Sequence, residues 1–516
     1  MTSPLGAEGS SWMRQIAGKV SVKNPKTVIK LHDLTGFDGR CDAIYFTTEE
    51  GKMPPSGLKE LEVFRRKALG LPDEAPLAGE YDLVVVGAGI AGMSAAVSAS
   101  RLGCKVALIN DRPVVGGNNS SEIRVHLGGR IEEGTYKELG GLQKEFGPEK
   151  GGNAQPAEYY EDQKKMDWLA GEKNVTLFLN YRAIGVTKEA DKISSVKVKH
   201  IESGKELEFK APLFSDCTGD GTIGYLSGAD YRMGREGRDE YGESIAPEKA
   251  DKMTMGSSVQ WYSVDNKKSS PFPEFSYGVE FNEKNCEKVM MGEWTWETGM
   301  NFDQIKDFER IRDYGMLVVY SNWSYLKNRM KENDQYKNRK LGWVAYVAGK
   351  RESRRLMGDY ILKEDDITKN VAHEDASFAT TWSIDLHWQD PKNSEHFPGN
   401  EFKAVTKHIL IHPYAVPYRC LYSRNVENLF MAGRNISVTH VALGTVRVMR
   451  TTGMMGEVVG MAASLCKKYG VTPRGVYRSH LDDLKTLMKE GVNKKGLPNN
   501  QRYNEGGILK DKPVVQ

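Results

Sequence analysis

Three glycines and one acidic residue have the types and spacing of a phosphate-binding turn. Gly87, Gly89 and Gly92 form a G-x-G-x-x-G run directly after an apolar stretch, and Asp111 follows a second apolar stretch. In such a turn the first glycine allows the tight bend, the second lets the backbone approach a pyrophosphate, and the third lets a helix pack closely on the preceding strand. The acid accepts hydrogen bonds from a ribose. This spacing predicts a dinucleotide site.

The elements that must position this site are predicted in the order strand, turn, helix, strand. Residues 83–86 and 106–109 are continuous apolar runs, as expected for buried strands of a parallel sheet. Small residues over 91–100 predict the helix between them, and its N-terminus offers free N–H groups and a positive dipole end to phosphates. We therefore expect an α/β fold with a Rossmann-like, doubly wound domain.

Segments farther along the chain resemble the glutathione-reductase-like flavoproteins and favour FAD over NAD. Asp111 is followed after four residues by Gly116-Gly117, as on the adenine side of those proteins. Residues 213–220 resemble their strand that ends in Ala-Thr-Gly and returns under the dinucleotide. Residues 428–434 resemble the strand that meets the ribityl chain of the flavin.

In detail the chain resembles the FAD-dependent oxidoreductase family, whose relatives include the fumarate reductase and succinate dehydrogenase flavoproteins. Residues 112–125 match its Arg-Pro-x-x-Gly-Gly-Asn-x-Ser-Ser-Glu-x-Arg-Val run, and further matches lie at residues 351–355, 384–387, 417–419 and 439–444. The resemblance implies an enzyme, an FAD-dependent oxidoreductase. A second G-x-G-x-x-G run at 219–224 has no strand and ribose acid after it, so we expect no separate NAD(P)H domain.

The resemblance also implies which residues hold the cofactor. Glu122 stands where fumarate-reductase relatives carry the histidine that bonds to FAD, so we expect non-covalent FAD. Arg434 stands where this clan usually has an Asp for a ribityl hydroxyl, so that contact must be replaced or lost. The full set of expected FAD contacts is Gly87, Gly89, Ala91, Gly92, Asp111, Arg112, Gly117, Asn118, Ser120, Ser121, Arg124, Thr218, Gly219, Asp220, Gly433, Arg434, Gly444 and Thr445.

Four further residues are candidates for the chemistry itself. His440 is the first choice for general acid or base, because an imidazole titrates near neutral pH; the alternative is a hydrogen-bonded structural histidine. Arg447 is expected to neutralise the reduced flavin or hold a substrate anion, unless it forms a salt bridge under the sheet. Asp385 and His387 have i, i+2 spacing, which places both on one side of an extended segment, where they orient a base or bind substrate hydroxyls.

These residues predict hydride transfer between a polar small molecule and flavin N5, with a carbohydrate or other hydroxylated metabolite as the preferred substrate. One alternative is a fumarate-reductase-like C=C oxidoreductase that acts on a carboxylate, and another is a non-catalytic FAD-binding electron-relay protein. Arginines facing the flavin favour the carboxylate, whereas an Asp–His pair with stacked aromatics favours the hydroxylated substrate. The electron acceptor or donor is left open, and so is a homo-oligomer.

The composition excludes several classes of partner. The 516 residues include 72 Lys and Arg against 69 Asp and Glu, a formal net charge of +3, which gives no reason to expect a nucleic acid or an anionic membrane surface. The six cysteines form no CxxC pair, so neither a redox disulfide nor a metal cluster is expected. No stretch is apolar enough to span a membrane, and residues 1–24 lack the pattern of a signal peptide. We expect a soluble cytoplasmic protein, or an exported, periplasmic one if the N-terminus has been trimmed.

The chain is predicted to divide into five regions. They are a short N-terminal extension that is partly β, the first part of the FAD-binding domain, an inserted α+β cap that binds substrate, the second part of the FAD-binding domain, and a C-terminal tail. In that order they cover residues 1–80, 81–237, 238–404, 405–470 and 471–516.

Alternation and periodicity predict individual elements within these regions. The extension is expected to hold strands at 26–30 and 42–47 and a helix at 57–69. A closing helix is expected over 450–469, where its glycines let the backbone approach a neighbour closely. A β-meander is expected from the alternating segments 175–179, 184–188 and 193–200.

Overall fold

A computed structural model describes residues 14–32 and 41–499, and the chain divides into two compact units, Met1–Ala68 and Leu69–Gln516. The described part of the first unit contains the predicted helix, α1 (Leu58–Ala68), but no strand. The strands predicted at 26–30 and 42–47 are therefore wrong. Those residues are exposed and pair with no strand among the described residues, and an alternating segment forms a strand only when it has a partner to pair with.

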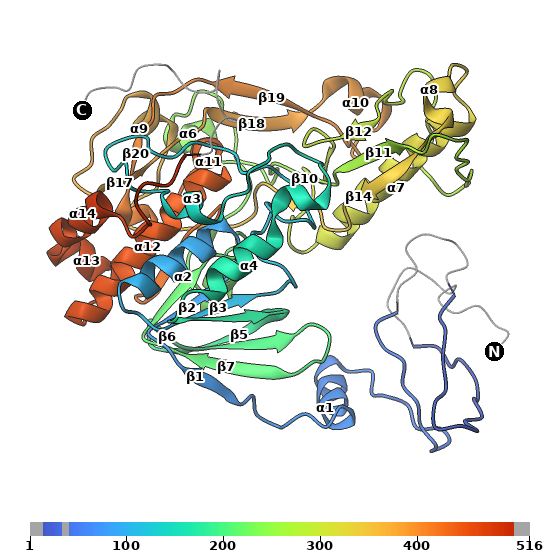
Figure 1. Cartoon of the computed structure of the whole chain (residues 1–516), viewed down its shortest axis with the longest axis horizontal. Helices are drawn as coiled ribbons and strands as arrows, with labels where there is room; N and C mark the ends of the chain where they lie inside the picture. Colours follow the sequence, from blue (N-terminus) through green and yellow to red (C-terminus); the bar gives the residue numbers. More distant parts are fainter. Residues whose placement is uncertain (1–13, 33–40, 500–516) are drawn as a thin grey trace. The chain divides into compact units, whose positions relative to one another are not determined.

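The second unit is built on a five-stranded parallel sheet. Four of its five strands are buried and mainly apolar, and the edge strand at 175–179 is only partly buried. In Figure 1 the labelled strands of this sheet, β2 and β3, lie below helix α2. The strand order is β21 (Leu429–Met431), β8 (Leu213–Asp216), β2 (Leu83–Val86), β3 (Val106–Asn110) and β4 (Val175–Leu179). This is the predicted α/β fold, with the phosphate turn after β2 and the expected ribityl strand at the opposite edge from β4.

Two helices pack against each other beside this sheet. Helix α2 (Ile90–Arg101) follows the phosphate turn, and α12 (Met449–Tyr469) is the predicted closing helix (Figure 1). A Cβ on Gly456 would collide with the carbonyl of Ala91, and one on Gly460 would lie 2.6 Å from the carbonyl of Ala95. The glycines of α12 are thus needed because the two helix backbones touch.

The β-meander differs from the prediction in one strand. It consists of β5 (Tyr181–Glu189), β6 (Lys192–His200) and β7 (Glu206–Lys210), with β1 (Leu77–Glu80) added in parallel at the edge. The segment 175–179, predicted to belong to the meander, is instead β4 of the parallel sheet, where Val175 pairs with Val106. Alternation marks a strand but does not identify its partner, and here the partner is distant in sequence.

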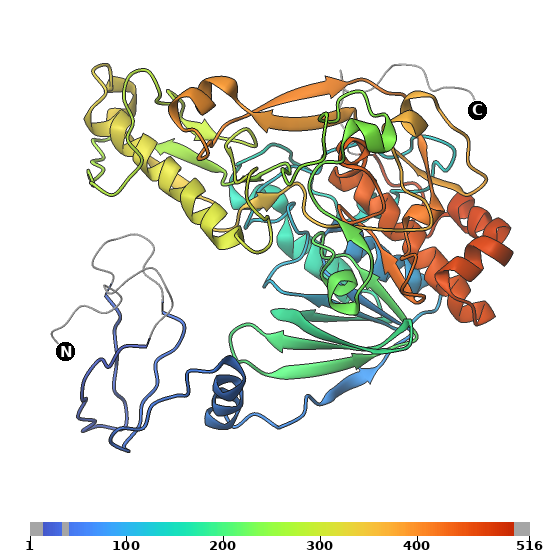
Figure 2. The same cartoon turned by 180° about the vertical axis from the view of Figure 1, so that it is seen from behind.

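A second hydrophobic core lies within residues 238–404, a tryptophan-rich region that holds seven of the nine tryptophans of the chain. Helix α7 (Phe308–Asn328) runs beside β11 (Trp261–Asp265) and β14 (Arg339–Val344), as Figure 2 shows for the long yellow helix. Trp261 and Trp323 are fully buried, and their rings meet edge to face. These tryptophans are therefore core residues. A hairpin of β18 (Ile384–Gln389) and β19 (Ala404–Ile409) carries the predicted Asp385 and His387.

The remaining elements are shorter. The helices are α3 (Leu142–Phe146), η1 (Ala157–Tyr160), α4 (Asp162–Ala170), α5 (Thr222–Ser227), α6 (Arg238–Tyr241), α8 (Asp334–Lys337), α9 (Glu364–Thr368), α10 (Pro391–His396), η2 (Tyr418–Cys420), α11 (His440–Val446), α13 (Pro473–Ser479) and α14 (Leu481–Glu490). The strands are β9 (Tyr231–Arg232), β10 (Ser257–Ser258), β12 (Met291–Gly292), β13 (Glu297–Thr298), β15 (Gly349–Lys350), β16 (Arg355–Leu356), β17 (Ala376–Ala379) and β20 (Ala415–Pro417).

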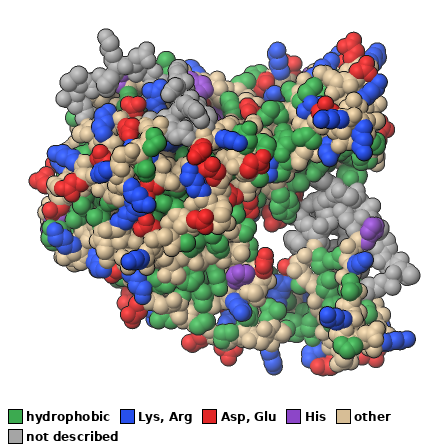
Figure 3. Space-filling model, in the orientation of Figure 1, with side chains coloured by type: hydrophobic (Ala, Val, Ile, Leu, Met, Phe, Trp, Pro, Cys, Tyr) green, Lys and Arg blue, Asp and Glu red, His purple; other side chains and the backbone are tan. Residues whose placement is uncertain are grey.

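The surface agrees with the balanced charge of the sequence. On the face seen in Figure 3, basic and acidic side chains of the described residues are interspersed, and neither sign forms a continuous patch among them. Within residues 14–32 and 41–499, none of the helices has the length and apolarity needed to cross a bilayer.

Candidate functional site

The phosphate turn after β2 has a geometry that only glycine allows. Gly87 has a φ of +101°, and a Cβ there would collide with the carbonyl of Cys217. A Cβ on Gly92 would collide with the carbonyl of Gly87. Gly89 is the N-cap of α2 and has no capping side chain, so the first N–H groups of the helix are open to a ligand. These features suit a bound diphosphate.

A second glycine loop closes on this turn. Gly89 pairs with Gly116 in a parallel bridge, and a Cβ on Gly117 would come within 3.2 Å of the Gly89 Cα. Asp111 is exposed at the end of β3, as a ribose ligand must be. The preceding residue, Asn110, was not predicted: its Oδ1 accepts from the Ala88 N–H at 3.2 Å and its Nδ2 donates to the Val114 carbonyl at 2.8 Å. Asn110 therefore fixes the two loops to each other.

The polar residues on either side of Gly117 have different partners. The Ser120 hydroxyl is buried and has no hydrogen-bond partner among the described residues, so it is available to a ligand. Asn118 donates to the carbonyl of Lys350 at 3.1 Å. The Arg124 guanidinium stacks over the Trp343 ring at 3.9 Å and donates to the Ser121 carbonyl at 2.8 Å, so it is directed toward the second core. Arg112 pairs with Glu122 at 3.7 Å.

The loop after β8 provides an acid opposite the unusual arginine. Asp220 accepts from Lys350 Nζ at 2.5 Å and lies 3.8 Å from Arg434 Nη2. Burial would raise the pKa of Asp220, but Lys350 and Arg434 hold it below its usual value. Arg434 packs on Gly219, and its Nη1 is buried without a partner in the described chain. The carboxylate that is missing at position 434 is thus present on the neighbouring loop.

Other predicted contacts serve the loops themselves. Thr218 donates from its hydroxyl to Asp216 at 2.7 Å. Gly433 has a φ of +115°, and a Cβ there would lie 3.9 Å from the Ala91 Cβ, so the end of β21 adjoins the start of α2. A Cβ on Gly444 would meet the Asp385 backbone at 2.7 Å, and Thr445 bonds the Ala442 carbonyl at 2.8 Å, so both residues fix α11.

Taken together, these residues fit the polar parts of FAD. The uncapped N–H groups after Gly89 would suit the diphosphate, and the exposed Asp111 would suit the adenosine ribose. The unpartnered Ser120 hydroxyl and the partly buried Asp220–Arg434 pair offer further polar groups. The described residues contain no group of His, Cys, Asp and Glu side chains that could hold a metal ion.

His440 is held by a buried carboxylate. It is the first residue of α11, and its Nδ1 lies 2.9 Å from Glu352 Oε2, while its backbone N–H donates to Glu236 at 2.8 Å. Glu352 also pairs with Arg355. Burial would raise the pKa of Glu352, but His440 and Arg355 lower it, so the carboxylate is charged and places the imidazole proton on Nδ1. Nε2 makes no hydrogen bond with the described residues.

His387 belongs to a second histidine–glutamate pair. Its Nδ1 lies 2.6 Å from Glu297 Oε2, and its Nε2 lies 2.9 Å from Arg447 Nη2. Because an arginine only donates, Nε2 must accept and the proton must be on Nδ1. Burial raises the pKa of Glu297, but Arg351 and His387 more than offset this and lower it to about 2. Both ring nitrogens of His387 are therefore engaged, unlike those of His440.

Arg447 joins this pair to Asp385. Its Nη2 donates to Asp385 Oδ2 at 2.7 Å. Arg351 contacts Glu297 at 3.5 Å and precedes Glu352 in the chain, so the two histidine–glutamate pairs are neighbours. The structure thus brings the four predicted catalytic residues together: His440 begins α11, Arg447 caps its C-terminus, and Asp385 and His387 lie on the adjoining strand β18.

Comparison with known proteins identifies the family. The family described as FAD dependent oxidoreductase matches residues 82–488. This chain belongs to that family. Its cofactor is FAD, and it is an FAD-dependent oxidoreductase. No curated protein matches the chain.

Solved structures resemble this oxidoreductase only distantly. A geranylgeranyl bacteriochlorophyll reductase-like protein from Thermoplasma acidophilum is 13% identical, with a TM-score of 0.33 over 80% of this chain and 83% of that chain. The Sdh1 complex of Mycobacterium smegmatis is 11% identical, with a TM-score of 0.32 over 81% and 77%. The myxobacterial halogenase CndH is 12% identical, with a TM-score of 0.33 over 79% of each chain.

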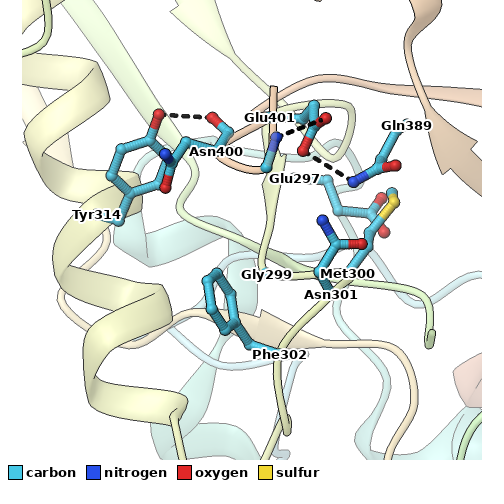
Figure 4. A pocket seen from close by; sticks show the side chains of 10 residues that line it. Glu297, Gly299, Met300, Asn301, Phe302, Tyr314, Gln389, Asn400 and Glu401 are labelled. Carbon is cyan, nitrogen blue, oxygen red and sulfur yellow. Dashed lines mark hydrogen bonds between the residues drawn. The ribbon is translucent and has the colours of Figure 1, made fainter. Parts of the chain in front are cut away.

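A small recess adjoins the second histidine–glutamate pair of the oxidoreductase. Figure 4 shows Glu297 at this recess, with Gln389 donating to Glu401 at 2.8 Å and Tyr314 donating to the Asn400 carbonyl at 2.6 Å. It has room for about one water molecule. The recess is therefore too small for a substrate and is not the site of the flavin.

The residues that the sequence did not single out as site residues are mostly carboxylates and cations of the second core. Glu297 and Lys350 lie on two-residue strands, β13 and β15, where no periodic pattern exists, whereas Arg351 falls in the family match at 351–355. The only available signal was their charge within an otherwise apolar, tryptophan-rich region.

Proposed function

We propose that this oxidoreductase transfers a hydride between a hydroxylated small molecule, with a carbohydrate as the leading candidate, and FAD. When bound, FAD supplies the hydride acceptor or donor at its N5 atom. The observation that carries the proposal is the Glu352–His440 pair, because it leaves one imidazole nitrogen without a partner at the start of α11.

The protein's part in the reaction is to move a proton and balance charge. As a hydride leaves a carbinol carbon, the hydroxyl must lose its proton, and His440 Nε2 would take it. Glu352 would stabilise the resulting imidazolium and keep the ring oriented. Arg434 and Arg447 would offset the negative charge of a reduced ring.

A second function is favoured by two buried guanidinium nitrogens. Arg434 Nη1 and Arg447 Nε have no hydrogen-bond partner among residues 14–32 and 41–499. Free arginine donors suit a carboxylate. The alternative is therefore a C=C oxidoreductase that acts on a carboxylate such as succinate.

Anaerobic bleaching of the flavin absorbance tests both functions. Purified, FAD-loaded protein is mixed without oxygen with sugars and polyols in one series and with saturated dicarboxylates in another. We expect a hydroxylated compound to bleach the flavin and His440→Ala to slow this by on the order of 100-fold while FAD stays bound. The exposed His396→Ala is the matched control.

Two outcomes decide against the proposal. Bleaching by dicarboxylates alone would establish the second function. An unchanged bleaching rate in His440→Ala would remove His440 from proton transfer.

We further propose that FAD is bound without a covalent bond and that residues 81–237 and 405–470 enclose it under a cap formed by 238–404. The glutamate at position 122, in ion-pair distance of Arg112, supports non-covalent binding, because a carboxylate is not the histidine that bonds FAD in related proteins. Denaturation in acid should release all of the flavin. Yellow colour that stays with the precipitated protein would contradict this.

A further inference from the structure

Two of the predicted catalytic residues, Asp385 and Arg447, each carry one buried polar atom that has no partner within the described chain. Asp385 is 7% exposed; its Oδ2 accepts from Arg447 Nη2 at 2.7 Å and from Trp382 Nε1 at 3.1 Å, but its Oδ1 makes no hydrogen bond within the described chain. Arg447 Nε is equally unpaired. These two atoms belong to side chains that are joined by the Arg447 Nη2–Asp385 Oδ2 hydrogen bond. A buried acceptor and a buried donor without partners each cost free energy, unless a ligand or water satisfies them.

The charges of these two atoms restrict what can bind. Burial would raise the pKa of Asp385, but Arg447, His387 and His408 hold it well below its usual value, so Oδ1 is an anionic acceptor. Arg447 Nε is a cationic donor. A hydroxyl group satisfies both, because it donates to one oxygen and accepts from another group. A carboxylate would meet repulsion from Asp385, and an ammonium would meet repulsion from Arg447.

The surroundings of Asp385 Oδ1 suit a hydroxylated ligand. The Nε2 atoms of His387 and His408 each lie 3.5 Å from it, beyond a good hydrogen bond but close enough to line a polar site. Trp382 is bonded to the same carboxylate, and Trp294 meets the His387 ring edge to face at 5.3 Å. Indole rings beside a hydroxyl-binding carboxylate offer apolar faces to the C–H groups of a sugar or polyol.

Helix α11 connects this pair of atoms to the proposed proton acceptor. Gly444 packs directly on the Asp385 backbone, which fixes α11 against β18. His440 and Arg447 are seven residues, about two helical turns, apart, so they lie on the same side of α11 at a distance of about 10 Å. A substrate held by Arg447 therefore has to extend along α11 to reach His440.

We propose that Asp385 and Arg447 bind one substrate hydroxyl that is remote from the reacting carbon, and so select a polyol or saccharide over a carboxylate. The proposal rests on the proposed function and adds the residues that would recognise the substrate.

The test compares affinity with rate for the sugar that bleaches the flavin fastest. Asp385→Asn keeps the shape of the side chain but loses the anionic acceptor. In this variant we expect the half-saturating concentration of the sugar to rise about tenfold or more. The limiting rate of flavin bleaching should fall by a smaller factor. The monodeoxy derivative lacking the bound hydroxyl should show the same loss on the unaltered protein and no further loss on the variant. Lys407→Gln, a change at an exposed residue of the same hairpin, is the matched control.

The possible failures are distinguishable. If every monodeoxy derivative keeps full affinity for the unaltered protein, the subsite is wrong even where Asp385→Asn does not fold. If no compound bleaches the flavin, the proposed function fails, and the subsite is measured by quenching of tryptophan fluorescence with sorbitol and succinate. Sorbitol binding that Asp385→Asn weakens would support the subsite, and tighter binding of succinate would overturn it.

Discussion

Met255 and Gly256, adjacent in the chain, donate from their backbone amides to two different buried glutamates. The Met255 N–H bonds Glu352 at 2.9 Å and the Gly256 N–H bonds Glu297 at 2.6 Å. Each glutamate holds one histidine, His440 or His387, by its Nδ1. One dipeptide thus fixes the orientation of both imidazoles, which is the preorganisation that proton transfer needs.

The first prediction concerns the carboxylate behind His440. Glu352→Gln keeps a hydrogen-bonding group beside Nδ1 but removes the charge that stabilises an imidazolium, so we expect flavin bleaching to slow by on the order of 100-fold. Because Glu352 also pairs with Arg355, bound FAD and the unfolding temperature must be measured in parallel. Glu352→Asp should recover part of the rate. Equal rates in Glu352→Gln and the unaltered protein would show that the pair is only structural.

The second prediction separates the phosphate turn from the fold. An alanine Cβ at Gly89 would have its nearest neighbour at 3.9 Å, so Gly89→Ala leaves the protein without FAD unstrained. The same methyl group would stand where the backbone approaches the diphosphate. We expect FAD affinity, measured by fluorescence titration, to fall tenfold or more with an unchanged unfolding temperature of the FAD-free protein. Gly185→Ala, whose Cβ would have its nearest neighbour at 3.8 Å, is the control; equal FAD affinity in both variants would place the diphosphate elsewhere.

The third prediction concerns the arginine that replaces the usual acid. Arg434→Gln removes a partly buried positive charge next to the proposed ribityl strand, so the reduced, more negative flavin should lose stabilisation. The midpoint potential, measured against redox dyes, should become more negative by about 30 mV or more. Removing the exposed charge of Lys407 with Lys407→Gln should leave it unchanged. An unaltered potential in Arg434→Gln would mean that Arg434 faces away from the flavin.

The sequence was sufficient where the contacts are local. The turn at Gly87 and Gly89 and the shared side of Asp385 and His387 follow from spacing alone, because a glycine turn and a strand have fixed geometry. Glu297 could not be found in this way, since its role depends on a histidine ninety residues away. The strands predicted at 26–30 and 42–47 were wrong for a related reason, because the pairing of strands depends on contacts between residues that are distant in sequence.

The last prediction concerns stability rather than catalysis. Glu457 lies in α12, fully buried; its Oε1 accepts from the Gly140 and Leu142 N–H groups, and its Oε2 has no partner among the described residues. Burial raises its pKa to about 8. An unfolded glutamate has a pKa of about 4.3. Between about pH 4.3 and 8 the folded chain therefore holds a proton that the unfolded chain lacks, and the free energy of unfolding falls as pH rises.

The Glu457→Gln side chain cannot ionise, so this variant should lose the fall in unfolding free energy with pH. Urea unfolding of the FAD-loaded protein at pH 5, 6.5 and 8 measures it: the Gln variant should gain relative stability with pH, while the exposed control Glu490→Gln should not. Parallel pH profiles for Glu457→Gln and the unaltered protein would mean that Glu457 is already charged in the core.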